Sequence, residues 1–88
     1  MKTIISTPKA PSAIGPYNQA TAFDKLIFTS GQIALDPQTM EIVIGGVKEQ
    51  TKQVMENLKA VLEEAGSSFE NVLKTTCYLS DMDNFVAF

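Results

Sequence analysis

Three residues near one another in the sequence could form a small polar binding pocket: Tyr17, Ser30 and Gly31. Tyr17 follows the turn pair Gly15-Pro16 and would supply a phenol, while Ser30 would supply a second hydroxyl. Gly31 has no Cβ, so its backbone N–H could approach a bound carboxylate closely. If these three groups lie together on a sheet, they could bind a small polar molecule.

The same residues also allow structural interpretations, which their types and spacing leave open. Tyr17 could be a half-buried aromatic residue that closes the Gly15-Pro16 turn. Ser30 and Gly31 could be a strand serine beside a bulge glycine, which is the more common arrangement. From the residues alone, a pocket and a structural turn therefore both remain possible.

For the other reactive side chains, the sequence favours structural roles over catalytic ones. The chain has no histidine that could activate Cys77, so we expect a buried structural thiol there. Asp81 and Asp83 could form an acid–base pair, but carboxylates that accept hydrogen bonds at a helix start explain them better.

The elements that must position these groups are short strands and one helix. We expect strands over residues 3–7, 18–23, 26–35 and 41–44, with a tight connection at Asp24-Lys25 and a turn around Asp36-Pro37. From Val47 to Ala65 apolar residues recur at steps of three and four, which predicts an amphipathic helix that Gly66 ends.

The end of the chain predicts a further strand and a further helix. Residues 72–80 have strand composition, and a strand–helix–strand unit implies a right-handed crossover and parallel neighbours. Ser80 would cap the last helix, with Asp83 in the capping-box position. The predicted fold class is therefore α/β (α+β), with a mixed β-sheet and helices packed on one face.

Composition limits the classes of partner. The net charge is −3, and all the basic residues are lysines spread singly along the chain, so we expect no nucleic-acid partner. No apolar run approaches the length of a membrane span, and the one cysteine cannot form an internal disulfide. We expect a cytoplasmic protein with no metal, no other cofactor and no membrane partner.

Five stretches carry a resemblance to a known family: residues 10–20 (APSAIGPYNQA), 29–33 (TSGQI), 50–66 around Asn57-Leu58, 74–79 (KTTCYL) and 82–85 (MDNF). On these motifs the chain resembles the RidA family of enamine/imine deaminases, also called the YjgF or endoribonuclease L-PSP family. The resemblance runs without a gap from Thr3 to Phe88.

The resemblance implies a chorismate-mutase-like fold and a homotrimer with a pocket at each subunit interface. The implied reaction hydrolyses 2-imino acids such as 2-iminobutanoate and 2-iminopropanoate to 2-keto acids and ammonia. It favours a substrate-binding role for Tyr17, Ser30 and Gly31, with Gln32 and Ile33 as pocket wall, and it implies no cofactor.

Part of the family pattern has no counterpart in this sequence. The family's substrate-gripping arginine and its glutamate, which handles the attacking water, would lie beyond Phe88, so no catalytic residue is assigned here. We expect a single domain over residues 1–88 that is incomplete at its C-terminal end, and that is inactive, less stable and prone to aggregate by itself.

Two alternatives to the deaminase remain. One is a trimeric module of the same fold that binds small carboxylates or a protein without turnover. The other is the ribonuclease or translation-inhibitor activity suggested for some relatives, which the lack of a basic patch, histidine and arginine disfavours.

Overall fold

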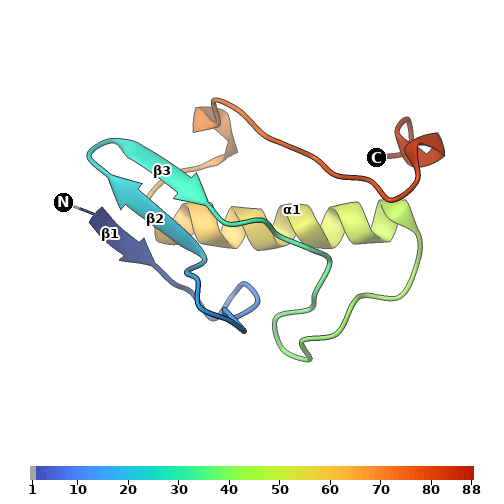
Figure 1. Cartoon of the computed structure of the whole chain (residues 1–88), viewed down its shortest axis with the longest axis horizontal. Coiled ribbons are helices and arrows are strands. Elements are labelled where there is room, and N and C mark those ends of the chain that lie inside the picture. The colour runs from blue at the N-terminus through green and yellow to red at the C-terminus, as the bar shows by residue number, and fades with distance from the viewer. Residues whose placement is uncertain (1) are drawn as a thin grey trace.

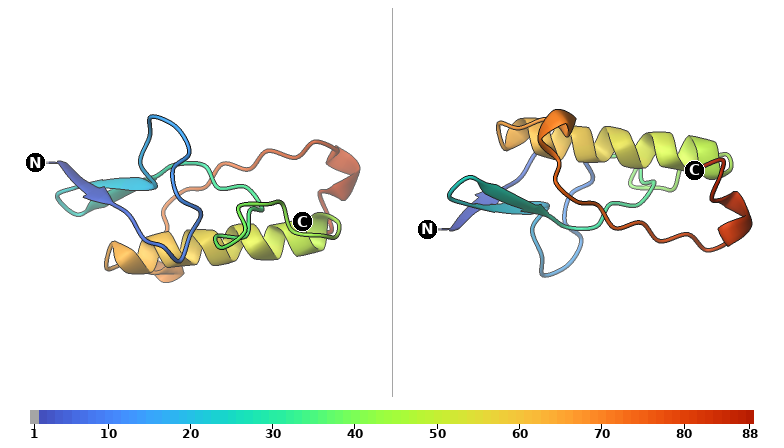
Figure 2. Two further views of the ribbon diagram at one scale, coloured as in Figure 1. Left: turned by 90° about the horizontal axis from the view of Figure 1, so that it is seen from below. Right: turned by 90° about the horizontal axis from the view of Figure 1, so that it is seen from above.

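The computed structural model describes residues 2–88, which form a small antiparallel sheet with one long helix on a single face (Figures 1 and 2). Strands β1 (Lys2–Ile5), β2 (Ala20–Phe23) and β3 (Leu26–Thr29) pair in the order β1-β2-β3. Helix α1 spans Val47–Glu64, and two 3₁₀ turns follow it, η1 (Phe69–Asn71) and η2 (Met82–Asn84). The predicted α/β (α+β) class, with helical structure on one face of the sheet, is confirmed.

The hairpin between β2 and β3 forms at the predicted place. Phe23 pairs with Leu26, so Asp24 and Lys25 make a two-residue connection. Asp24 has φ +55°, a left-handed conformation that aspartate tolerates better than most residues. This connection fixes the register of β3 against β2.

Helix α1 begins and ends where the sequence predicted. At its start, the Glu49 carboxylate accepts a hydrogen bond from the N–H of Gly46 at 3.0 Å. At its end, Gly66 has φ +82° and donates to the Glu63 carbonyl at 3.0 Å, while Ser67 donates to the Leu62 carbonyl at 2.8 Å. These two bonds form a Schellman motif, which satisfies carbonyl groups that the helix leaves open.

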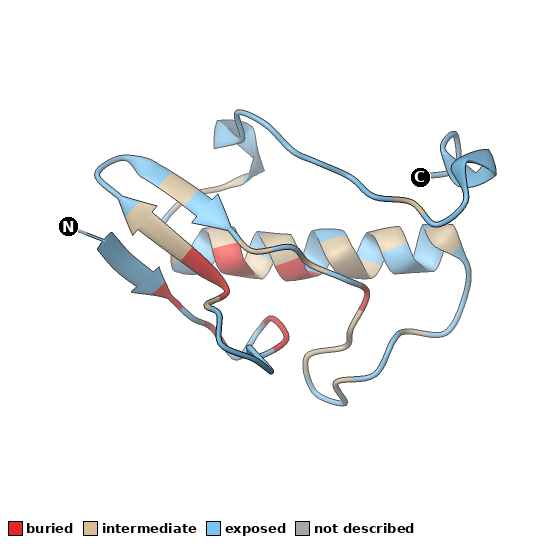
Figure 3. Cartoon of the chain, in the orientation of Figure 1, coloured by how far each residue is buried: buried red, intermediate tan, exposed pale blue. Residues whose placement is uncertain are grey.

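A small core lies between the sheet, the helix and the loop that precedes β2. Ile5 and Ala20 contribute from the strands, Ala10 from the loop and Val61 from α1. Figure 3 shows these buried positions gathered where β1, β2 and the loop face the helix. The opposite face of the sheet is left without a covering layer in the described part of the chain.

Several predicted strands are shorter than expected or absent. The strand predicted over 26–35 ends at Thr29, and the one predicted over 41–44 is reduced to a single bridge between Ile42 and Leu35. The strand predicted over 72–80, and with it the parallel pairing, is wrong, since this segment is unpaired and the sheet is antiparallel throughout residues 2–88. A strand needs a neighbour for its backbone hydrogen bonds, and no described segment supplies one here.

Two predictions within the C-terminal segment also need correction. Cys77, expected to be buried, is exposed, because the unpaired segment that carries it is not covered. The cap of the last turn is Asp81 rather than Ser80: its carboxylate accepts a hydrogen bond from the N–H of Asp83 at 2.9 Å. The final helix is only the 3₁₀ turn η2, but the interpretation of Asp81 as a capping carboxylate is confirmed.

Candidate functional site

Tyr17 lies in the loop between β1 and β2, immediately after the Gly15-Pro16 turn. Its N–H donates to the carbonyl of Gly15 at 2.8 Å, and a Cβ at Gly15 would lie 3.7 Å from the tyrosine ring. The ring therefore closes over Gly15, as the structural interpretation expected. Nevertheless 47% of the residue is exposed, so this packing leaves the phenol accessible to a ligand.

Ser30 directly follows β3 and contacts the chain just beyond Tyr17. Its N–H donates to the Gln19 carbonyl at 2.9 Å, and its hydroxyl donates to the carbonyl of Asn18. These bonds bring Ser30 next to the segment that carries Tyr17. Because the hydroxyl proton is already used, Ser30 Oγ is available to a ligand as an acceptor.

Gly31, Gln32 and Ile33 continue from Ser30 across an open surface. Gly31 is exposed, and no heavy atom lies within 4 Å of the place where a Cβ would stand. Gln32 is half-buried, while Ile33 is 61% exposed. Since β3 ends at Thr29, Gly31 is not a bulge glycine within a strand.

The segment after Gly31 is fastened to helix α1 by a buried amide. The Nδ2 atom of Asn57 donates to the carbonyls of Ile33 at 3.2 Å and Leu35 at 3.0 Å. Its Oδ1 atom accepts a hydrogen bond from Gln53 at 2.9 Å, and Asn57 is 0% exposed. The position of the predicted pocket wall therefore depends on α1.

Asn57 and Gln19 are the two large polar residues buried near the candidate site, and no role was predicted for either from the sequence. For Asn57 a signal existed, because it lies at helical spacing from Val54 and Val61 on the apolar face of α1. Gln19 follows a loop rich in proline, whose backbone groups lack regular partners. Neither signal specifies which carbonyl groups the amides bind.

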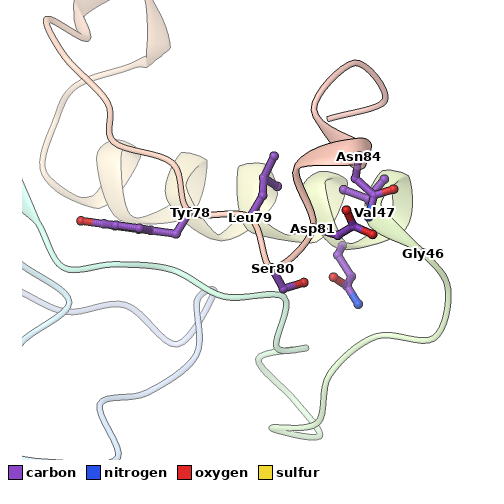
Figure 4. A pocket seen from close by; sticks show the side chains of 8 residues that line it. Gly46, Val47, Tyr78, Leu79, Ser80, Asp81 and Asn84 are labelled. Atoms are coloured by element: carbon purple, nitrogen blue, oxygen red, sulfur yellow. The ribbon is translucent and has the colours of Figure 1, made fainter.

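A cavity of about 420 Å³ lies elsewhere, between the start of α1 and the C-terminal segment (Figure 4). Its lining residues are Gly46, Val47, Gln50, Tyr78, Leu79, Ser80, Asp81 and Asn84. None of the five predicted site residues lines it. Tyr78 is 92% exposed, so this hollow is shallow rather than an enclosed site.

Residues 2–88 contain neither a metal-binding cluster of side chains nor a helix that could span a membrane. No cluster of three or more histidine, cysteine, aspartate or glutamate side chains there is arranged to hold a metal ion. Within the same residues, α1 and the shorter turns lack the apolar length that crossing a bilayer requires.

Known proteins resemble the chain along nearly its whole length. A family model described as Endoribonuclease L-PSP matches residues 7–88. A RutC family protein of Pyrococcus abyssi is 56% identical over 84 residues, which are 96% of this chain and 66% of the relative. The 2-iminobutanoate/2-iminopropanoate deaminase of Mus musculus is 51% identical over 85 residues, which are 97% of this chain and 63% of the relative.

The fold is similar to that of solved Rid proteins. A crystal structure of a conserved Rid family protein from Yersinia pestis superposes with a TM-score of 0.96 at 40% identity. The superposition covers 99% of this chain and 69% of that one. By comparison, the chain spans 66% and 63% of the lengths of the two curated relatives described above, which is just under two thirds.

Proposed function

The chain belongs to the endoribonuclease L-PSP (RidA) family, and from this we propose that the complete protein hydrolyses 2-imino and enamino acids to 2-keto acids and ammonia. The observation that carries the proposal is the 51% identity to a protein named 2-iminobutanoate/2-iminopropanoate deaminase. That alignment covers 97% of this chain, so it includes the segments around Tyr17 and Ser30. We therefore propose 2-iminobutanoate and 2-iminopropanoate as substrates.

The reaction replaces a C=N bond by a C=O bond. Water adds to C2 of the imine, the nitrogen takes up protons, and ammonia leaves as the carbonyl forms. The substrate is an anion, so its carboxylate must be held while water attacks. A group near the nitrogen must also accept or supply hydrogen bonds.

The described residues offer groups that could bind the substrate. Gly31 has open space around its Cα, so a substrate carboxylate could reach its N–H. Ser30 Oγ would accept a hydrogen bond from the substrate nitrogen, because its own proton is donated to Asn18. The exposed phenol of Tyr17 would close the pocket, with Gln32 and Ile33 as its wall.

We also propose that the complete protein is a cytoplasmic homotrimer with pockets at subunit interfaces. Support comes from the sheet face opposite α1, which exposes four large apolar side chains: Ile4, Phe23, Leu26 and Phe28. Burying such a face against a second copy would be favourable. A shared interface would also supply walls for a site that lies on an open surface in one copy.

The test compares the two tyrosines of the complete protein. The substrate is generated in the assay from threonine by a pyridoxal-phosphate dehydratase, and 2-oxobutanoate release is measured against spontaneous hydrolysis. Tyr17→Phe is expected to lower kcat/KM roughly tenfold, the value of one hydrogen bond to the substrate. Tyr78→Phe is the matched control, since Tyr78 is 92% exposed and lines the other cavity, which none of the candidate site residues lines, and it should leave the rate unchanged.

The outcomes separate the candidate functions. A wild-type protein that binds 2-oxobutanoate but does not accelerate imine hydrolysis would be a binding module. RNA cleavage by a preparation free of contaminating nuclease would favour the ribonuclease. That result would contradict the expectation, drawn from the dispersed lysines and the net charge of −3, that the protein does not bind nucleic acid.

A further inference from the structure

The side chain of Gln19 makes four hydrogen bonds to the backbone of the loop that precedes it. It immediately precedes β2 and is 3% exposed. Its Oε1 accepts from the N–H of Thr7 at 2.6 Å, and its Nε2 donates to the carbonyls of Thr7 at 3.0 Å, Ala10 at 3.3 Å and Pro11 at 2.8 Å. One amide thus holds both ends of residues 7–11.

This loop segment has no regular structure that could satisfy its backbone. Residues 6–19 contain neither helix nor strand, and prolines at positions 8, 11 and 16 lack an N–H. Yet Thr7 and Ala10 are 6% and 1% exposed, so their carbonyls are cut off from water. The Gln19 amide replaces the partners that a sheet would have supplied.

The backbone of Gln19 extends the same network to the candidate site. Its carbonyl accepts the N–H of Ser30, and the preceding carbonyl of Asn18 accepts the Ser30 hydroxyl. Tyr17 stands two residues before Gln19. The side chain therefore fixes the loop on one side, while its main chain fixes Ser30 on the other.

We propose that Gln19 is the positioning residue of the candidate site: its buried amide anchors residues 7–11, and so sets where Tyr17 stands relative to Ser30. This inference rests on the proposed function for the identity of the ligand, but the anchoring itself does not. Gln19 is buried and does not touch substrate. Its loss would loosen the binding surface without removing any group that contacts the ligand.

The first readout is proteolysis of the complete protein, which needs no activity. Trypsin can cleave after Lys9, whose side chain is exposed, but only if the chain at Ala10 comes free. Wild-type protein should resist cleavage at this bond, and Gln19→Leu should be cut there about tenfold faster, as measured by mass spectrometry of the released fragment. Gln19→Glu is the second variant, because it keeps the side-chain size and the acceptor for Thr7 but loses both N–H donors.

The matched control is Glu56→Gly, an exposed substitution inside α1 that weakens the helix and leaves every Gln19 bond in place. Cleavage at Lys9 should be no faster in this control than in wild type at equal distance from the melting temperature. If Gln19→Leu and Gln19→Glu both resist trypsin as well as wild type does, the anchoring role is overturned.

The second readout is the kinetics of imine hydrolysis. Both Gln19 variants should raise KM about tenfold with kcat within about twofold, whereas Glu56→Gly should change neither. Loss of trypsin protection with an unchanged KM would overturn the link between the loop and the site. An inactive wild-type protein would instead contradict the proposed function, and the trypsin result would still decide whether Gln19 holds the loop.

Discussion

Asn57 illustrates how a single buried amide connects an irregular segment to regular structure. It is fully buried on α1 and binds the carbonyls of Ile33 and Leu35. Neither segment 30–35 nor the turn after it belongs to a strand. The amide therefore provides an attachment that sheet pairing does not.

We predict that Asn57→Leu lowers the free energy of unfolding of the complete protein by about 2 kcal/mol, because it removes both hydrogen bonds that Asn57 donates to the carbonyls of Ile33 and Leu35. Gln53→Ala is the control: it removes only the bond that Gln53 donates to Asn57, and it should cost less than about 1 kcal/mol. Urea unfolding followed by circular dichroism measures both. Equal midpoints for the two variants would mean that the carbonyl contacts contribute nothing.

At the scale of elements, a glycine with a positive φ stands near each end of α1, Gly45 before the helix and Gly66 after it. Gly45, just before the helix, has φ +127°, and a Cβ there would lie 2.6 Å from Cγ of Glu49, the residue that caps the helix start. Gly66, just after the helix, has φ +82° but open space where a Cβ would stand. Both glycines are required by the backbone, but only Gly45 is also required by packing.

The two glycines should therefore respond differently to alanine. Gly66→Ala is expected to destabilise by about 1 kcal/mol through backbone strain alone. Gly45→Ala adds a clash with the capping side chain, and the expected loss is about 2–3 kcal/mol. Differential scanning calorimetry of both variants gives the comparison, and a smaller loss for Gly45→Ala than for Gly66→Ala would contradict the argument.

At the scale of the whole molecule, the described residues leave large apolar side chains uncovered. Ile4 and Phe28 are 58% and 61% exposed on the sheet face opposite α1. One edge of β3 is unpaired within residues 2–88, and unpaired edges promote association. Beyond the sheet, residues 72–80 form an extended segment without a partner (Figure 1).

We expect the 88-residue polypeptide by itself to self-associate, measured by size-exclusion chromatography with light scattering over a range of concentrations. Phe28→Lys should reduce this association, because it places a charge on the open face. Ile44→Lys is the control, since Ile44 is 98% exposed and belongs to none of the three strands of the sheet. A monomer at every concentration would show that the open face does not drive association.

Predictions that depend on residues a few positions apart in the sequence are confirmed, whereas a strand that needs a distant partner was predicted wrongly. Helix α1, its Gly66 ending and the turn at Asp24 depend on residues a few positions apart, and these predictions are confirmed. The strand predicted over residues 72–80 is wrong, because strand composition does not supply the partner that a strand requires. The roles of Tyr17, Ser30 and Gly31 as ligand-binding residues stay predictions.

The sequence by itself determined α1, the β2–β3 hairpin and membership of a family, because periodicity, turn residues and motifs are local properties of the chain. Only the tertiary structure decided which backbone groups the amides of Gln19 and Asn57 bind, and that Ser30 lies against Asn18 and Gln19. Those contacts join residues distant in the sequence. They form because carbonyls outside regular structure have no helix or sheet partner and need another donor, and the fold determines which donor is within reach.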